Sequence, residues 1–338
     1  MPGPRDPELL VRAARLYYEQ HLSQDAVARA LGTSRSNVSR MLTAAQDLGI
    51  VEIRIHDPAG RASDLERALV QRFGLEQAIV AERAKDPGVN PLDRVGQLAW
   101  HWLHGELRDG MTLALSWGRS LQAMVWAASE SPVGIEVVQL VGGLSSVASE
   151  ISGQELVREL ATRIGARYRY LHAPAIFESA AARDLMMAEP SVAEALDAAR
   201  RADLAVVGIG AVAQGSSAAI LRALRLDDDE VREFEGSGAV GDLSARFFDA
   251  AGREVGGAVH DRVLALTLDE IRTIPRVVGL AVGREKVDGV AAALRGGLVD
   301  VLVCDATVAR GVLSQSVEAV PAQATPPTPA LAGNRSAS

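Results

Sequence analysis

The chain concentrates two arginines, an asparagine and three serines in the seven residues 34–40. Arginine can pair with guanine through two hydrogen bonds, asparagine with adenine, and serine with base edges or phosphate oxygens. Val38, Met41 and Leu42 recur at spacings of three and four, so a helix here turns them inward and the polar residues outward. The candidate contacts are Ser34 at the helix cap, then Arg35, Ser36, Asn37, Ser39 and Arg40. This pattern predicts a DNA-reading face, and the open alternative is a solvated face of a protein-contacting helix.

A second set of candidate residues follows apolar runs later in the chain. The loop after MTLAL reads Ser116-Trp117-Gly118-Arg119-Ser120 and leads into a predicted helix. A glycine turn that feeds a helix N-terminus gathers backbone N–H groups, and these suit a phosphate. Further polar or glycine positions after apolar runs are Gly142, Gly143, Asp242 and Lys286. Each is a weak signal alone, because strand-to-helix turns use glycine in any α/β protein.

Lys286 is unusual for the composition of this chain. The 35 basic residues include only two lysines, Lys85 and Lys286. A lysine that persists after an apolar run in a glycine-rich turn favours a compact ammonium, for instance against a phosphate or sugar oxygen. An ordinary surface lysine is the open alternative.

The elements that would position the first set are three short helices and a strand. Residues 8–19 carry a helical apolar stripe, Ser23 can cap a second helix that Gly32 ends, and Ser34 can cap a third that Gly49 ends. Residues 51–55 alternate apolar and charged, as a half-buried strand does. The order predicts an all-α, winged helix-turn-helix domain over residues 1–56.

The elements that would position the second set alternate between strands and helices. We expect a linker at 57–62 and a domain at 63–316, with strands in MTLALS, residues 135–140, LAVVGIG, VLALTL, VVGLAVG and VDVLVC. Helices are expected at 64–73, 153–164 and 287–294. The alternation predicts an α/β domain with a mostly parallel sheet, and ligands bind such sheets beyond the carboxyl ends of the strands. The Pro- and Ala-rich residues 317–338 are expected to be a disordered tail.

Composition excludes several classes of protein. The 338 residues are 48% hydrophobic with a net charge of −8, which suits a chain with a sizeable core and more than one domain. We find no membrane-length apolar run and no signal peptide, so the cytoplasm is the expected location. The single Cys304 is expected in a buried strand, and of the six histidines only His101 and His104 lie close together, so neither a metal nor another cofactor is expected.

The charge is unevenly distributed. Residues 1–56 carry seven arginines against six carboxylates, a net charge of +1. Because the whole chain has a net charge of −8, residues 57–338 carry −9. A globally acidic protein can bind a polyanion if the positive charge is local and the rest faces away.

The run LSQDAVARALGTSRSNVSRMLTAAQDLGIVEIRI resembles the DNA-binding segment of the SorC family of bacterial transcriptional regulators. The stretches ALSWGRS, VVQLVGG, LHAPAIFES, ADLAVVGIG, GAVGDLSARFFDAAG and GLAVGREKVDGVAAALRGGLVDVLVCDA resemble the sugar-binding domain of the same family. Two positions depart from it: Gln46 stands where an arginine is common, and Ser120 where threonine is. The resemblance extends over residues 8–315, nearly the whole chain.

The resemblance implies a Rossmann-like effector domain of the ribose-5-phosphate isomerase, glucosamine-6-phosphate deaminase and CoA-transferase-like type. It implies a regulator that binds double-stranded operator DNA, with Gln24 added to the contacts, and a phosphorylated sugar or related effector. Ser116–Ser120 would hold the phosphate or polar head group, and Gly142, Gly143, Asp242 and Lys286 would line the pocket. A homo-oligomer, a dimer or tetramer, is expected because one small winged helix contacts few phosphates, and the resemblance implies that tetramers are common.

The alternative left open is a sugar-phosphate isomerase or deaminase with an accessory winged helix, using Asp242 or Asp305 as a general base. An NAD site is weaker still, because GIGAVAQG lacks the third glycine.

Overall fold

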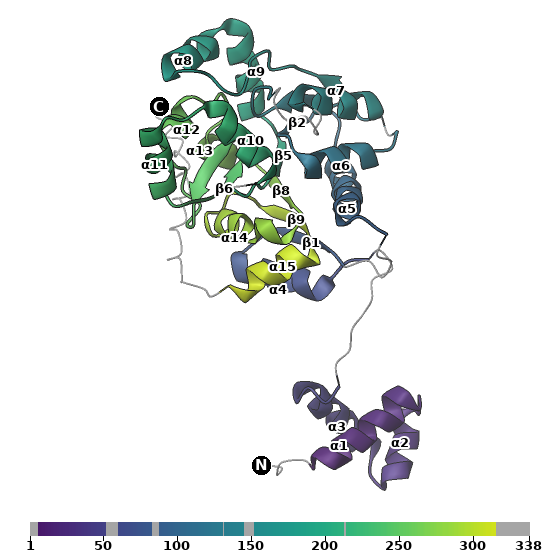
Figure 1. Cartoon of the computed structure of the whole chain (residues 1–338). Coiled ribbons are helices and arrows are strands. Elements are labelled where there is room, and N and C mark those ends of the chain that lie inside the picture. The colour runs from purple at the N-terminus through teal and green to yellow at the C-terminus, as the bar shows by residue number, and fades with distance from the viewer. Residues whose placement is uncertain are drawn as a thin grey trace, which may run out of the picture. The chain divides into compact units, whose positions relative to one another are not determined.

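The computed structural model describes residues 6–51, 60–82, 88–130, 132–144, 152–212 and 214–315. The chain divides into two compact units, one ending at His56 and the other beginning at Asp57 (Figure 1). Each unit has its own hydrophobic core and is described by itself.

The N-terminal unit is a bundle of short helices: α1 (Pro7–Ala14), continued by the π-helix η1 (Arg15–Glu19), then α2 (Gln24–Leu31) and α3 (Arg35–Asp47). The expected caps are present, since Ser23 Oγ accepts from the N–H of Ala26 and Ser34 Oγ from the N–H of Asn37, both at 3.2 Å. Gly32 ends α2 with a φ of 65°, which favours glycine. The order of helices and turn is therefore the one predicted from the sequence.

The core of this unit consists of the residues that the apolar spacing selected. Val27, Val38 and Met41 are almost completely buried, together with Leu10 of α1. Burial of these side chains fixes the rotation of α3 and so leaves its polar side outward. Residues 52–55 of the strand predicted at 51–55, and residues 57–59 of the predicted linker, lie outside the described residues.

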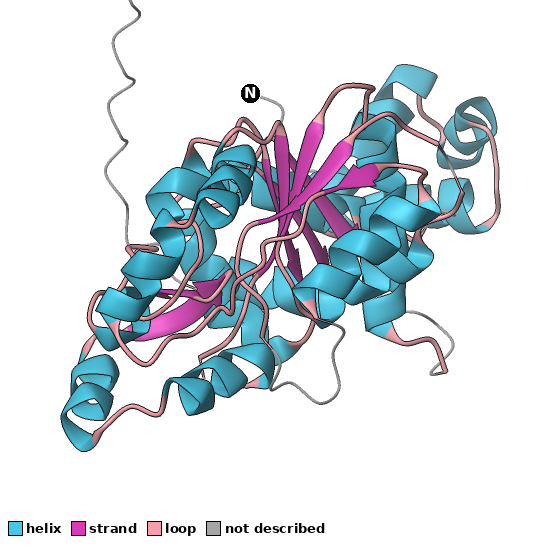
Figure 2. Ribbon diagram, turned by 90° about the horizontal axis from the view of Figure 1, so that it is seen from above, coloured by secondary structure: helices cyan, strands magenta, loops and turns pink. Residues whose placement is uncertain are grey.

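The larger unit is built on a seven-stranded sheet in the order β1-β9-β8-β5-β2-β3-β4, and every neighbouring pair is parallel. The strands are β1 (Gln77–Ala81), β2 (Thr112–Leu115), β3 (Glu136–Gln139), β4 (Arg167–Tyr168), β5 (Leu204–Gly208), β8 (Val277–Ala281) and β9 (Val301–Asp305). Figure 2 shows the sheet with helices on both faces. The central strands are buried on both faces, as their continuous apolar runs require. The predicted α/β class with a mostly parallel sheet is confirmed.

Helices of the larger unit connect the strands and cover them. They are α4 (Ser63–Phe73), α5 (Pro91–Glu106), α6 (Arg119–Ala127), α7 (Gly153–Arg163), α8 (Ala180–Ala188), α9 (Pro190–Arg200), α10 (Gly215–Leu224), α11 (Asp228–Gly236), α12 (Ala258–Asp261), α13 (Leu268–Arg272), α14 (Val287–Arg295) and α15 (Ala306–Ser314), with the 3₁₀ turn η2 (Arg284–Lys286) before α14. Helices α5 and α6 cross closely at Gly96, where a β-carbon would lie 2.5 Å from the backbone carbon of Ala123. Only glycine at position 96 permits this close packing of α5 on the middle of α6.

The strand predicted in VLALTL is wrong. Val263 and Ala265 form only isolated bridges, to Ile176 and Val141, and Leu268 already begins α13. A buried arginine explains the difference. The guanidinium of Arg246 donates to the carbonyls of Val263, Ala265 and Leu266, at 3.3, 2.6 and 3.2 Å. These carbonyls are therefore satisfied by a side chain instead of by a neighbouring strand.

Arg246 belongs to a separate antiparallel hairpin of β6 (Ala239–Leu243) and β7 (Arg246–Asp249). Its side chain is 1% exposed and also donates to the carbonyl of His260 at 3.0 Å. Glu254 lies 3.6 Å away and provides the nearest opposite charge. Burial lowers the pKa of Arg246, and Glu254 raises it in part. The hairpin is thus fastened to the rest of the unit through a buried cation.

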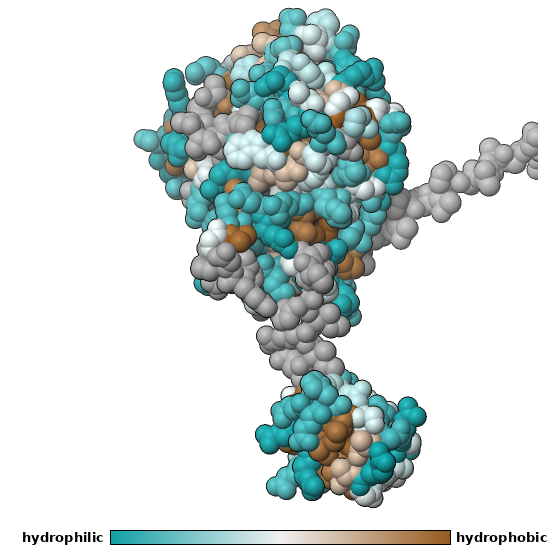
Figure 3. Space-filling view, turned by 90° about the vertical axis from the view of Figure 1, so that its right-hand side faces the viewer, coloured by the Kyte–Doolittle hydropathy of each residue, from teal (hydrophilic) through white to brown (hydrophobic). Residues whose placement is uncertain are grey.

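Cys304 lies in β9 and is fully buried, as expected, and burial raises the pKa of its thiol well above the ordinary value. Among the described helices, none is both long and apolar enough to cross a bilayer. Figure 3 shows one face of the larger unit as mostly hydrophilic, with hydrophobic surface in small separate patches. Scattered patches of this kind are ordinary on protein surfaces.

Candidate functional site

A pocket opens beyond the carboxyl ends of three adjacent strands, β8, β5 and β2. From β2 the chain moves to β3 and β4 on one side and then to β5 on the other, so the strand order reverses between β2 and β5. Parallel α/β sheets bind ligands at such reversals. The pocket holds about 560 Å³ of empty space, part of it open to solvent. Its lining residues are Leu92, Trp117, Gly118, Arg119, Ser120, Gly208, Ile209, Gly210, Gly215, Ser216, Ser217, Asp242, Ser244, Val282 and Lys286.

Three helix N-termini meet at this pocket. Its lining includes the first residues of α6 and α10 and the cap residue of α14, which is Lys286. None of the three helices has a side-chain hydrogen bond at its N-cap. α14 continues directly from η2, and the N–H of Val287 already donates to the carbonyl of Arg284. The uncapped first-turn N–H groups of α6 and α10, together with the helix dipoles, favour a bound anion.

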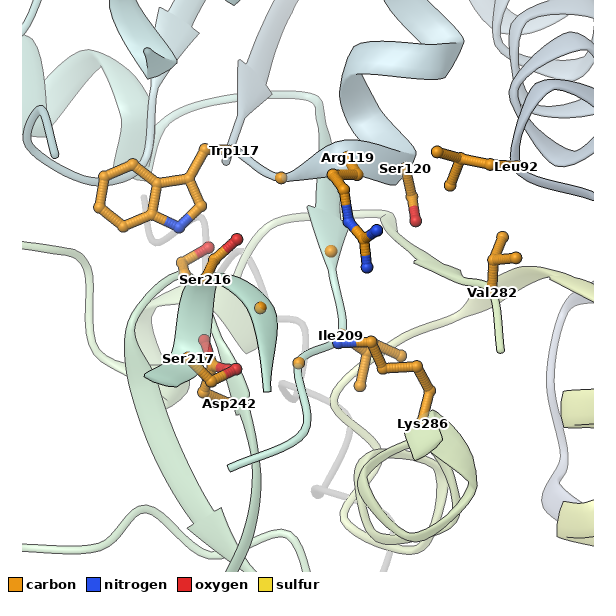
Figure 4. A pocket seen from close by; sticks show the side chains of 15 residues that line it. Leu92, Trp117, Arg119, Ser120, Ile209, Ser216, Ser217, Asp242, Val282 and Lys286 are labelled. Carbon is orange, nitrogen blue, oxygen red and sulfur yellow. The ribbon is translucent and has the colours of Figure 1, made fainter. Parts of the chain in front are cut away.

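The start of α6 is shaped by glycine. Gly118, its N-cap, has a φ of 115°, a conformation that residues with a β-carbon avoid. Figure 4 shows Arg119 and Ser120 on one side of the pocket and Lys286 reaching in from its helix on another side. The glycine turn at the start of α6, with Arg119 from α6 and Lys286 from the cap of α14, suits a phosphate or carboxylate.

Asp242 lies at the opposite side of the pocket and is 5% exposed. The hydroxyl of Ser217, in the first turn of α10, donates to Asp242 Oδ1, and the N–H of Ala245 also donates to this carboxylate. Burial raises the pKa of Asp242 above its ordinary value of 3.8, and Ser217, Lys286 and Ala245 lower it in part. The pocket therefore has an electropositive end at α6 and an acceptor end at Asp242.

The raised pKa of Asp242 predicts a pH effect on stability. The folded state binds the proton more readily than the unfolded state, so the contribution to stability is complete below pH 3.8 and is lost as pH rises through the folded pKa. Asp242→Asn removes this titration. The melting temperature of Asp242→Asn should therefore rise relative to that of wild type as pH increases from about 4 to 7. Thermal melts of both proteins across that range test this, and a difference that stays constant would contradict it.

The structure brings together six of the nine residues predicted for the effector site: Trp117, Gly118, Arg119, Ser120, Asp242 and Lys286 line one pocket. Ser116 precedes them at the end of β2, 2% exposed, and its hydroxyl has no partner in the described part of the chain. Gly142 and Gly143 lie elsewhere. Gly142 packs against the backbone of Pro174, and Gly143 lines a separate hollow with Phe177. Their role in effector binding stays a prediction.

Sequence reasoning missed the residues that α10 and the β6–β7 turn contribute. Ser216 and Ser217 belong to the first turn of α10, which the sequence analysis did not place, although GSS after a glycine-rich turn is a helix-start signal. Ser244 lies in the two-residue turn of the hairpin, and nothing in the letters SA indicates such a turn. These hydroxyls reach the pocket through tertiary contacts.

The predicted DNA-reading face is on the surface of α3. Arg35, Ser36, Ser39 and Arg40 are exposed, and Ser34 is exposed at the cap. Arg40 donates to Ser36 Oγ at 3.1 Å, one turn earlier. Asn37 and Gln24 of α2 are partly exposed. These polar residues are therefore accessible, and their contacts with DNA stay a prediction.

Two internal contacts refine this face. The side-chain amide of Asn37 donates one of its two hydrogens to Thr33 Oγ1 at 2.8 Å. A bidentate contact with adenine needs the other hydrogen and the amide oxygen. Gln46, which departs from the family pattern, donates to the hydroxyl of Tyr18 at 3.0 Å. It therefore ties α3 to η1.

The structure also places the residues considered for other chemistry. His101 and His104 are exposed on α5, and within the described ranges no group of three or more His, Cys, Asp or Glu side chains could hold a metal ion. Asp305 caps α15 by accepting from the N–H of Thr307 and also accepts from the N–H of Gly283, both at 3.1 Å. It lines a different hollow from Asp242, so the two carboxylates do not share one site.

Comparison with known proteins agrees with this arrangement. Residues 57–314 match the model of the sugar-binding domain family. The transcriptional regulator LsrR of Enterobacter sp. (strain 638) is 33% identical over 312 residues, which cover 91% of this chain and 94% of the relative. This chain belongs to the SorC family of sugar-binding transcriptional regulators.

Two further regulators match over a similar share of the chain. The deoxyribonucleoside regulator of Bacillus subtilis is 29% identical over 308 residues, 91% of this chain and 97% of that protein. The full-length sorbitol operon regulator SorC from Klebsiella pneumoniae superposes with a TM-score of 0.69 at 27% identity, covering 91% of this chain and 99% of that one. These relatives are regulators of transcription, which favours a binding role for the pocket over catalysis.

Proposed function

We propose that this sugar-responsive regulator binds operator DNA through the exposed face of α3 and that a phosphorylated sugar or a related polyhydroxy compound in the larger unit changes that binding. The observation that carries the effector assignment is the polarity of the pocket. Uncapped helix N-termini with Arg119 and Lys286 suit an anionic group, and the buried acceptor Asp242 suits sugar hydroxyls.

The effector can act only through a difference in its affinity for DNA-competent and DNA-incompetent states. Couplings of this kind are typically about 1–3 kcal/mol, or roughly 5- to 150-fold in DNA affinity. Since linkage is reciprocal, operator DNA should change effector affinity by the same factor.

A homo-oligomer follows from the size of the DNA-binding unit. One short helix contacts few phosphates, so specific binding at physiological salt requires a second copy on a two-fold operator. We propose a dimer or tetramer. Footprints on such an operator should show half-sites about 34 Å apart, or a multiple of that spacing.

The direct test uses the full chain with DNA from upstream of its own gene, in gel shifts and footprints with and without a panel of sugar phosphates. A protected site whose occupancy changes with one of the panel supports the proposal. No protected site at moderate salt, under any condition, rejects the DNA role, and a site that no sugar phosphate affects rejects the effector class.

Replacing Arg35 by Ala should weaken specific operator binding by about 1–3 kcal/mol, roughly 5- to 150-fold, because an exposed arginine in the first turn of α3 can form two hydrogen bonds with guanine. Arg12→Ala in α1, another exposed arginine, is the matched control for net charge. Fluorescence anisotropy with the specific site and with random DNA measures both variants. If Arg35→Ala and Arg12→Ala lose the same affinity on both DNAs, α3 does not read the bases.

A further inference from the structure

The turn that joins β6 to β7 has an unusual backbone for its sequence. It consists of Ser244 and Ala245, whose φ angles are 55° and 66°. Two-residue hairpin turns with both residues left-handed ordinarily use Asn and Gly, because a β-carbon crowds the neighbouring carbonyl in this conformation. Strained residues of this kind cluster at functional sites, where the surrounding structure holds them in place. This turn lies at the wall of the pocket, which Ser244 lines.

The hydroxyl of Ser244 is buried without a hydrogen-bond partner. The residue is 1% exposed, and its Oγ has no partner in the described part of the chain. Buried polar atoms are almost always paired, so an unpaired hydroxyl at the wall of this pocket indicates a group that pairs when the ligand binds. Ser217 is equally buried at the same pocket, but its hydroxyl already donates to Asp242.

Asp242 fixes where the Ser244 hydroxyl lies. Its carboxylate accepts from the N–H of Ala245 and from Ser217 Oγ, and so it connects the turn to the first turn of α10. The backbone N–H of Gly210 also donates to the carbonyl of Asp242, at 2.8 Å. The turn is therefore held from the segment that follows β5 and from α10. Ser244 lines the pocket two residues after Asp242, which lies across the pocket from Arg119 and Ser120 (Figure 4).

We propose that Ser244 selects the effector by hydrogen-bonding one of its hydroxyl groups, at the end of the ligand remote from its anionic group. This rests on the proposed function, with the anion at the start of α6. The ligand is then a phosphorylated polyhydroxy compound. When it is bound, one of its hydroxyl-bearing carbons lies next to Asp242 and Ser244. Deoxy analogues that lack this hydroxyl bind more weakly, because they leave the buried Ser244 oxygen unpaired.

The test compares pairs of sugar phosphates that differ by one hydroxyl: ribose 5-phosphate with 2-deoxyribose 5-phosphate, and glucose 6-phosphate with its 2-, 3- and 4-deoxy analogues. Dissociation constants are measured by calorimetry on the full chain. Wild type should prefer the hydroxyl-bearing member of at least one pair by about tenfold or more. In Ser244→Ala that preference should fall to nearly one, while the affinity for the deoxy member changes little.

Ser244→Gly separates binding from folding. Glycine removes the hydroxyl and also relieves the crowding at φ 55°, so this variant should melt above Ser244→Ala while losing the same preference. Thr162→Ala, which removes an exposed hydroxyl on α7, is the control and should keep the preference.

The outcomes separate this inference from the proposed function. If wild type binds sugar phosphates but shows no preference within any pair, or if both Ser244 variants keep the wild-type preference, Ser244 does not read a hydroxyl and the inference is wrong. If no sugar phosphate binds wild type at all, the proposed effector class fails first and the inference fails with it.

Discussion

The Arg246→Met variant should melt roughly 10 °C below wild type, since the loss of a buried, hydrogen-bonded charge costs about 3–5 kcal/mol and each kcal/mol shifts a unit of this size by about 2–4 °C. Arg246 is 1% exposed and donates to the carbonyls of His260, Val263, Ala265 and Leu266. Methionine fills similar volume but donates to none of them. The three buried carbonyls of Val263, Ala265 and Leu266 are then left unpaired, and Glu254 loses a buried counter-charge.

Two variants make this expectation specific. Arg253→Met removes an arginine whose side chain is 79% exposed and pairs with Asp249 at 3.4 Å, so it should change the melting temperature by about 2 °C or less. Arg246→Lys keeps the charge but offers three donors in another geometry, and should fall between wild type and Arg246→Met. If Arg246→Met and Arg253→Met had the same melting temperature, the buried guanidinium would not hold the hairpin.

Gly210→Ala should weaken effector binding by about a hundredfold or more and should lower the free energy of unfolding by about 1–3 kcal/mol. A β-carbon at this position would lie 1.8 Å from Asp242 Oδ1 and 2.4 Å from Ser217 Oγ. Both side chains are buried and cannot move into solvent. The methyl group must therefore separate the Ser217–Asp242 pair and displace the hairpin turn at the acceptor end of the pocket.

The matched control is Gly105→Ala on α5, where a β-carbon meets nothing within 4 Å. Alanine inside an exposed helix is favoured over glycine by about 0.5–1 kcal/mol, so this variant should be slightly more stable and should bind the effector as wild type does. Calorimetry with the sugar phosphate that gives the largest thermal shift on wild type measures all three proteins. Wild-type affinity in Gly210→Ala would show that the Ser217–Asp242 pair has no part in binding.

Local sequence patterns predicted the helix ends of this protein correctly where a single capping residue or glycine determines where the helix starts or stops. Ser23, Ser34 and Gly32 set the ends of α2 and α3, because caps and left-handed turns depend on only a few neighbouring residues. The same patterns failed at VLALTL. Its alternation suits a strand, but the partner that satisfies its carbonyls is Arg246, about 20 positions earlier in the chain. No local signal reveals such a partner.

The sequence by itself determined the helix-turn-helix, the parallel α/β class and the loop at Ser116–Ser120, because apolar periodicity and glycine turns act over a few residues. Only the tertiary structure decided which of the glycine-rich turns share a pocket. It brought the ends of β2, β5 and β8 together and left Gly142 and Gly143 outside. It also placed Ser244 in that pocket, because the position of a hairpin turn depends on buried contacts with distant residues, here Asp242 with Ser217 of α10.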